Sequence, residues 1–250
     1  MLFRSLYVLN AGDPNQGIAA NITGFRVDAD GRLGAIPNST RALSTAAPGP
    51  AQVQFHPWGD TLVVTEKDTN RIDLFDVDDG VAGPAVVHPS SGQTPFGFSF
   101  DKRGHLIVSE AFGGAPNASA MSSYDLTDAA SALEVISASV PTLQTAACWV
   151  AVTKNGKFAY TTNTGSGTIS GYRISRSGEL TLLDADGVTA STGAGSTPLD
   201  IALSRDGRFA FSLNPGVGTI ASFRVGAGGG LASVGTVPGI PASASGLVAR

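Results

Sequence analysis

The chain has 250 residues, of which 32 are glycine and 14% are charged, and its formal net charge at pH 7 is −4. This length predicts one domain with a large core, and low charge with many glycines is typical of packed sheets joined by tight turns. The negative charge and the lack of a basic cluster in the sequence argue against nucleic acid as a partner. No apolar run is long enough to cross a membrane, and the single cysteine, Cys148, excludes an internal disulfide.

The N-terminus begins abruptly. Strand-like sequence at Leu6–Leu9 starts almost at once, and residues 1–5 can be back-translated as the end of a sequencing adapter. We therefore expect residues 1–5 to be a non-native leader on a truncated bacterial gene product. The sequence favours a cytoplasmic location, but a lost signal peptide would make the protein periplasmic or secreted.

A strand–turn–strand pattern recurs along the chain. Four glycines each close a short turn between two apolar stretches, and successive glycines are separated by 45, 52 and 51 residues; they are Gly59, Gly104, Gly156 and Gly207. A period of roughly fifty residues with hairpin chemistry in each unit predicts a β-propeller. In the fourth unit, Asn155-Gly156 is a two-residue hairpin signal between the apolar stretches 147–153 and 157–162.

The repeat predicts an all-β fold, a single propeller domain over residues 1–250 built from four-stranded antiparallel blades. Five blade equivalents are expected, at about 6–45 together with 246–250, at 50–90, at 95–140, at 146–195 and at 198–240. The first of them lacks a first strand, and Gly246–Ala249 looks like a first strand with nothing after it. We expect these two ends to share one blade, which would hide two sheet edges.

A polar residue ends the second strand of every unit, on the face where the second-to-third and fourth-to-first loops meet. These residues are Asn10, Glu66, Glu110, Asn163 and Asn214. They either cap their own turns through backbone amides or form a ring of carboxylates and amides at the channel mouth. The two glutamates are poor turn formers, so they are the candidate catalytic residues. Candidate substrate-binding residues are the three asparagines with Lys67, Gln144 and Trp149.

The chain resembles the lactonase seven-bladed propellers, which include bacterial 6-phosphogluconolactonase and the fungal carboxymuconate-lactonizing enzyme. The resemblance covers essentially the whole chain. It rests on inner strands that end in Pro/Asp-x-Gly, on Leu6-Tyr-Val-Leu-Asn10 and on Val64-Thr-Glu-Lys67, which is similar to the family's Val-Asn-Glu-Leu. Family members have about two more blades, which implies an open or incompletely closed ring here.

The resemblance implies a carboxylic ester hydrolase that opens a sugar lactone or a related lactone. Glu66 or Glu110 would act as the base that activates water, and Lys67 or the asparagines at 163 and 214 would donate to the oxyanion. The family's Gly-Pro-Arg-His is Gly49-Pro-Ala-Gln52 here, and Thr164 and Pro215 stand where the family often has an arginine. Arginine is the residue that binds phosphate through two points, so a phosphorylated substrate is disfavoured.

Two further interpretations remain open. One is a non-catalytic propeller that binds a protein or a glycan on its loop face, which the missing histidine and arginine favour. The other is a variant of the lactonase in which the carboxylates and amides hold Ca²⁺, a hard cation that prefers oxygen ligands. The resemblance is to metal-independent enzymes, so we expect no cofactor and no metal, a small-molecule lactone as the ligand, no membrane partner and a monomer.

Overall fold

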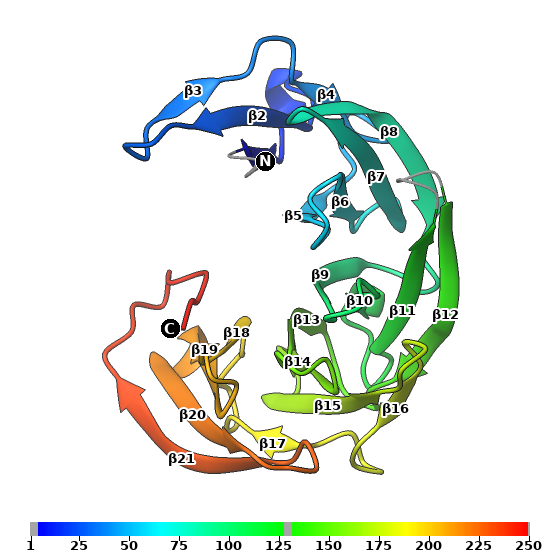
Figure 1. The fold of residues 1–250 in the computed structure, drawn as a ribbon. Coiled ribbons are helices and arrows are strands. Elements are labelled where there is room, and N and C mark those ends of the chain that lie inside the picture. The colour runs from blue at the N-terminus through cyan, green and yellow to red at the C-terminus, as the bar shows by residue number, and fades with distance from the viewer. Residues whose placement is uncertain (1–4, 128–131, 250) are drawn as a thin grey trace. The chain divides into compact units, whose positions relative to one another are not determined.

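Figure 1 shows a computed structural model of the chain, which describes residues 5–127 and 132–249. These residues form antiparallel sheets joined by turns, with three short 3-10 helices. The all-β propeller architecture predicted from the repeat is confirmed. The chain divides into two compact units, an N-terminal unit (residues 1–90 with 126–134) and a C-terminal unit (residues 91–125 with 135–250). The single domain over 1–250 stays a prediction.

The N-terminal unit contains two sheets, called here blades 1 and 2. Blade 1 consists of β1 (Ser5–Asn10), β2 (Asn21–Val27), β3 (Leu33–Ala35) and β4 (Arg41–Ala42), and blade 2 of β5 (Pro50–Phe55), β6 (Thr61–Glu66), β7 (Arg71–Asp78) and β8 (Val81–Pro89). In blade 1, β3 and β4 both pair with β2, so the outer strand is interrupted. Ser5 opens β1, and the rest of the expected leader lies outside the described residues.

The C-terminal unit contains the other sheets, blades 3 to 5, with part of the outer hairpin of blade 3 grouped with the N-terminal unit. Blade 3 consists of β9 (Pro95–Phe100), β10 (Leu106–Glu110), β11 (Ala120–Thr127) and β12 (Ala132–Pro141). Blade 4 consists of β13 (Ala147–Val152), β14 (Phe158–Asn163), β15 (Thr168–Ile174), β16 (Leu180–Leu182) and β17 (Ala190–Ser191). Blade 5 consists of β18 (Asp200–Leu203), β19 (Phe209–Asn214), β20 (Thr219–Val225) and β21 (Leu231–Pro238). The 3-10 helices η1 (Pro14–Gln16), η2 (Phe112–Gly114) and η3 (Pro215–Val217) lie between second and third strands.

The repeated glycines sit where the first hairpin of each blade reverses direction. Their φ angles are +83° at Gly59, +97° at Gly104, +67° at Gly156 and +70° at Gly207. This left-handed conformation is strained for residues with a Cβ, which explains why glycine recurs at this point of the repeat. In the same turns the side chains of Asn155 and Asp206 accept hydrogen bonds from the backbone amides two residues later.

Buried tyrosines join neighbouring blades within each unit. In the N-terminal unit the Tyr7 hydroxyl, on β1, donates to the carbonyl of Gly80 and accepts from the amide of Ala82 in the next blade. In the C-terminal unit Tyr160, on β14, donates to the carbonyl of Gly229 in blade 5 over 2.7 Å. Burial raises the pKa of the Tyr160 phenol, so the hydroxyl stays a donor at any ordinary pH.

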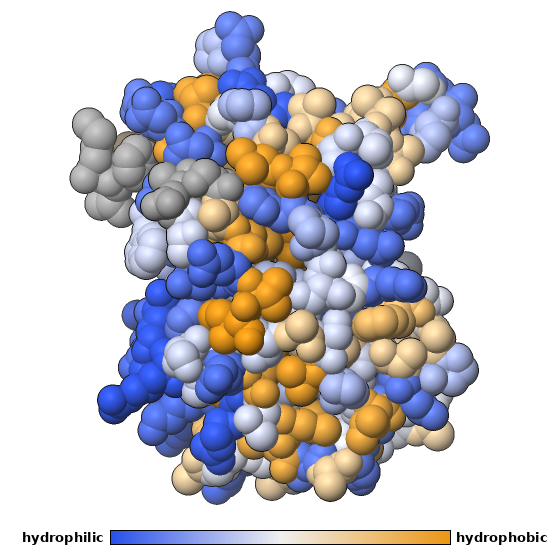
Figure 2. Space-filling model, turned by 90° about the vertical axis from the view of Figure 1, so that its right-hand side faces the viewer, coloured by the Kyte–Doolittle hydropathy of each residue, from blue (hydrophilic) through white to orange (hydrophobic). Residues whose placement is uncertain are grey.

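The outer strands carry apolar side chains that reach the surface. Val86 and Val87 on β8 are 39% and 40% exposed, and Val234 and Val237 on β21 are 56% and 59% exposed. Figure 2 shows apolar residues at the surface in separate patches between polar ones. Isolated exposed apolar residues are ordinary on protein surfaces, so we infer no function from those on these strands.

The C-terminal segment differs from the expectation. Residues 246–249 form no strand, so the expected first strand at 246–250 is wrong for the four of them that the structure describes. The amide of Leu247 instead donates to the carboxylate of Asp200 over 2.6 Å, which ties this segment to β18. A hydrogen bond to a side chain far away in the sequence is thus found where strand pairing was expected.

Gly97 lies where two inner strands of the C-terminal unit, β9 and β13, approach closely. A Cβ built on Gly97 would lie 2.7 Å from the carbonyl oxygen of Cys148 and 2.8 Å from the Cα of Trp149, both on β13. Both are backbone atoms, so the strands themselves would have to separate.

We therefore predict that Gly97→Ala lowers the free energy of unfolding by roughly 1–3 kcal/mol, the usual effect of overpacking. Chemical denaturation of the full chain measures it. The matched control is Gly34→Ala on β3, where an added Cβ meets no atom within 4 Å. Equal stability of the two variants would contradict the close packing of β9 on β13.

Candidate active site

The residues that end the second strands lie at corresponding places in their blades. Glu66, Glu110, Asn163 and Asn214 each pair with the first residue of the following strand, and all four are fully buried. Asn10, at the same place in blade 1, is exposed. Strand period and register therefore predict their position correctly, and the direction of each side chain decides what it does.

Glu66 is held by groups of its own unit. Its carboxylate accepts hydrogen bonds from the Ser44 amide (2.9 Å), from the Ser44 hydroxyl and from the Thr69 hydroxyl (2.5 Å). Ser44 belongs to the segment between blades 1 and 2, and Thr69 to the turn after β6. The carboxylate thus fastens the incoming connection to the end of the second strand.

Asp73 lies beside Glu66 and forms a carboxyl pair with it. Asp73 is fully buried on β7, and its Oδ2 accepts from the Ser44 amide at 3.1 Å. Burial, followed by the hydrogen bond and the negative charge of Glu66, raises the pKa of Asp73 to about 8. Its Oδ1 meets no donor among the described residues. A proton shared between the two carboxyls accounts for both observations.

Glu110 has an equivalent set of partners in the C-terminal unit. Its carboxylate accepts from the amide of Gly92 (2.8 Å) and from the hydroxyls of Ser122 (2.5 Å) and Ser139 (2.6 Å). Ser122 occupies the place on β11 that Asp73 occupies on β7, since each pairs with the residue two before the glutamate. Three donors hold this buried carboxylate, and the Gly92 amide among them ties it to the connection before β9.

The amide candidates are also held by neighbouring groups, although the buried Oδ1 of Asn163 meets no donor among the described residues. Asn163 donates to the hydroxyls of Thr168 and Ser170, and Asn214 accepts from the Ser212 hydroxyl. Asn10 donates to Asn21, and Gln144 donates to the carbonyl of Asp186 while accepting from Thr168. The backbone amide of the half-buried Lys67 donates a hydrogen bond to the carbonyl of Gly49. The structure thus favours anchoring over a catalytic ring, and the catalytic role expected of Glu66 and Glu110 stays a prediction.

A different set of side chains surrounds a cavity in the C-terminal unit. It has a volume of about 340 Å³ and is lined by residues from three inner strands and from the C-terminal segment: Phe96, Cys148, Trp149, Leu199, Asp200, Ser245 and Gly246. The rings of Phe96 and Trp149 meet edge to face with centroids 6.2 Å apart. Of the candidates named from the sequence, Trp149 alone is among these lining residues.

Asp200 is the ionisable group of this cavity besides the thiol. Its side chain is 5% exposed and accepts from the amides of Ile201 (2.7 Å) and Leu247 (2.6 Å). Burial raises the pKa of Asp200, and the two amides oppose that rise. A carboxylate with one amide on each oxygen still has free lone pairs, so it can accept a proton from a bound molecule.

Sequence reasoning missed Asp200, although the repeat contains a signal for it. Counting three residues back from the end of each inner strand gives Gln52, Gly97, Trp149 and Asp200. Asp200 is the charged member of that series. Its carboxylate accepts from the amide of Leu247, which is 47 residues away along the chain, and no local pattern could predict that contact.

No group of three or more histidine, cysteine or acidic side chains in residues 5–127 and 132–249 is arranged to hold a metal ion. In the same residues no helix is long and apolar enough to cross a membrane.

Comparison with known proteins points to one family. Residues 120–240 match the family model of the lactonase seven-bladed β-propellers. No curated protein matches the sequence. Among solved structures, a proposed 6-phosphogluconolactonase of Bacteroides uniformis matches with a TM-score of 0.77 and 22% identity, over 95% of this chain and 69% of that one. The periplasmic gluconolactonase of Pseudomonas aeruginosa matches with a TM-score of 0.73 and 21% identity, over 94% and 69%. At these identities the structures establish the fold, and the family resemblance seen in the sequence is confirmed.

The pair formed by Glu66 and Asp73 generates a pH prediction. The folded state keeps the Asp73 proton up to a pH of about 8, whereas the unfolded chain loses it near the ordinary value of 3.8. The free energy of unfolding should therefore fall as the pH rises between these values, by at most about 1.4 kcal/mol per pH unit. Asp73→Asn should remove this part of the slope, because an amide donates to Glu66 at every pH.

Denaturation at several pH values measures the slope. Asp76→Asn, an exposed position on the same strand, is the matched control and should leave it unchanged. An Asp73→Asn variant with the slope of the wild-type chain would contradict the shared proton.

Proposed function

We propose that this chain, whose residues 120–240 belong to the lactonase seven-bladed β-propeller family, opens small-molecule lactones in the cavity around Asp200. The single observation that supports this site best is a desolvated carboxyl at the wall of an otherwise apolar cavity, beside an aromatic pair. A pocket with apolar walls and one perturbed ionisable group is the usual form of an active site.

The proposed chemistry is base-assisted hydrolysis. The Asp200 carboxylate takes a proton from water as the water oxygen bonds to the lactone carbonyl carbon, which gives a tetrahedral oxyanion. The ring C–O bond then breaks, and the departing alkoxide takes the proton back from Asp200, so the product is a hydroxy acid and the carboxylate is regenerated. The exposed hydroxyl of Ser245, on the cavity rim, is the proposed donor to the oxyanion.

The burial of Asp200 is the feature that suits it to this role. A carboxylate with a raised pKa is a stronger base than a solvated one, which brings it closer to the value that is best for proton transfer near neutral pH. The rings of Phe96 and Trp149 offer an apolar surface on which the carbon face of a lactone ring can pack.

The substrate we propose is an unphosphorylated sugar lactone or a related lactone. The cavity wall holds no lysine, arginine or histidine. A phosphate brought beside Asp200 would meet a carboxylate and no cation, which is unfavourable. Among the matching structures, the Pseudomonas aeruginosa protein is named as a gluconolactonase, a name that carries no phosphate.

The kinetic test uses a panel of aldonolactones, with and without phosphate, and subtracts spontaneous hydrolysis at each pH. We expect turnover of the unphosphorylated members, and a loss of about 10²–10⁴-fold in kcat in Asp200→Asn, the usual contribution of a general base. Glu179→Gln, an exposed carboxyl in the turn before β16, is the matched control and should keep full activity. Turnover that survives in Asp200→Asn but vanishes in Glu66→Gln would place the base on β6 and contradict the proposal.

A binding measurement separates the enzyme from the non-catalytic alternative. The chain has two tryptophans, and Trp58 is 66% exposed in the N-terminal unit. In Trp58→Phe the remaining fluorescence comes from Trp149, which should respond to added lactone in proportion to occupancy of the cavity. Trp149→Phe should lose that response. A lactone-dependent signal without turnover would favour a binding propeller, and turnover without any Trp149 response would place the site elsewhere.

A further inference from the structure

The C-terminal unit separates its charges between its two ends. Nine lysines and arginines, which are all those it has within the described residues, lie in or beside the turns that join first to second and third to fourth strands. They are Lys102, Arg103, Lys154, Lys157, Arg173, Arg176, Arg205, Arg208 and Arg224, and all of them are exposed. We call this set of turns the basic face. The sequence shows no basic cluster because these residues are spread over more than a hundred positions.

Acidic residues do not neutralise this face. Five described carboxylates lie at the same end of these blades, on Asp101, Asp125, Glu134, Glu179 and Asp206, so the formal excess is four positive charges on a chain whose net charge is −4. The opposite end of the unit, which contains the cavity of Asp200, carries carboxylates and no described lysine or arginine. The basic face is therefore separate from the proposed active site.

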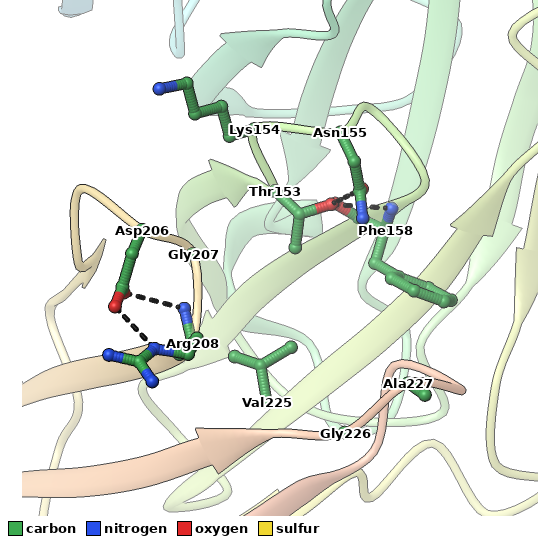
Figure 3. Close-up of a pocket in the computed structure, with 10 residues that line it drawn as sticks. All are labelled: Thr153, Lys154, Asn155, Phe158, Asp206, Gly207, Arg208, Val225, Gly226 and Ala227. Carbon is green, nitrogen blue, oxygen red and sulfur yellow. Dashed lines mark hydrogen bonds and ion pairs between the residues drawn. The ribbon is translucent and has the colours of Figure 1, made fainter.

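Most of these cations are not engaged in ion pairs. Within the described residues Arg103 pairs with Asp101 at 3.8 Å, and Arg208 pairs with Asp206 at 2.5 Å. Arg173 lies over the ring of Phe158 at 5.1 Å from the centroid. Figure 3 shows Lys154 extended away from the other labelled side chains, with no interaction drawn to it, whereas Arg208 turns toward Asp206.

The turns of the three blades lie against one another. Gly156 in the first turn of blade 4 approaches Lys102 in the first turn of blade 3, and Gly178 in the outer turn of blade 4 approaches His105. A cavity of about 410 Å³ is lined jointly by turn residues of blades 4 and 5, including Lys154 and Arg208 (Figure 3). Six of the cations come from first turns, near the inner strands, and three come from outer turns. The cations are thus spread in two directions over the surface of this end, and do not follow a single line.

Although the sequence led us to expect no membrane partner, we propose that the basic face docks the protein on an anionic lipid membrane. An area of exposed cations on adjacent turns matches the planar array of headgroups on such a surface, whereas a linear polyanion would be matched by a line of cations. The aromatic side chains that share a cavity with Lys154 and Arg205 on this face, Phe209 and Phe211, are half-buried, whereas stacking of bases relies on aromatic faces open to the solvent. With no exposed apolar wedge among these cations, docking is electrostatic and reversible and leaves the Asp200 cavity on the end away from the lipid.

Co-sedimentation with vesicles tests the proposal. The full chain is mixed with vesicles of phosphatidylcholine alone, or with vesicles in which about a third of the lipid is phosphatidylserine. We expect binding to the anionic vesicles only, and a decrease as the ionic strength rises through the physiological range. Lys154→Gln with Arg205→Gln should weaken partitioning about 30-fold, at about fivefold for each cation removed.

The matched control is Asn117→Asp with Ser191→Asp, which lowers the net charge by the same two units at exposed positions on the opposite end of the same unit and should leave partitioning unchanged. Near-ultraviolet circular dichroism checks that both variants fold. Equal binding by variant and control, equal binding to neutral vesicles, or no binding to anionic vesicles at low salt would each overturn the proposal. Binding to a soluble polyanion such as heparin without binding to vesicles would also overturn it, because it would identify a polymer as the partner.

Discussion

Antiparallel pairing within each blade is the constraint on which the other features depend. Because the chain reverses at every strand, the first-to-second and third-to-fourth turns lie at one end of a blade, and the other connections lie at the opposite end. In the C-terminal unit, the repeated turn glycines at 104, 156 and 207, the short hairpins that they close and the nine cations lie at the first end. The buried carboxyl and amide groups and the cavity of Asp200 lie toward the second. One rule of connectivity thus separates structural turns from the candidate site.

Two kinds of buried carboxyl follow from that arrangement, and their hydrogen bonds distinguish them. Glu66 and Glu110 each accept three hydrogen bonds from hydroxyls and amides of their own blade and of the connection that precedes it. Asp200 accepts one amide on each oxygen and borders a cavity with apolar walls. A buried carboxylate held by three donors stabilises a fold, whereas a desolvated carboxyl with more free lone pairs beside a cavity is available for chemistry.

The sequence predicts the fold better than it predicts the site. The spacing of Gly59, Gly104, Gly156 and Gly207 is enough to place the hairpins, because backbone conformation at a turn is a local property. The same repeat places Glu66 and Glu110 at strand ends but cannot show that serine hydroxyls distant in the sequence would meet them. Asp200 accepts from the amide of Leu247, in a segment that was wrongly expected to form a strand. The proposed site is built from contacts between distant segments, which the pattern of a single sequence does not reveal.

The most direct test of this account is a crystal structure of the protein soaked with an aldonate, the hydroxy acid that lactone hydrolysis would release. The account predicts density for the aldonate in the cavity between Trp149 and Asp200, with the carboxyl of Asp200 within hydrogen-bond distance of the ligand. Density for the aldonate against Glu66 or Glu110, with the Asp200 cavity empty, would contradict it and would restore the strand-end glutamates as the catalytic groups.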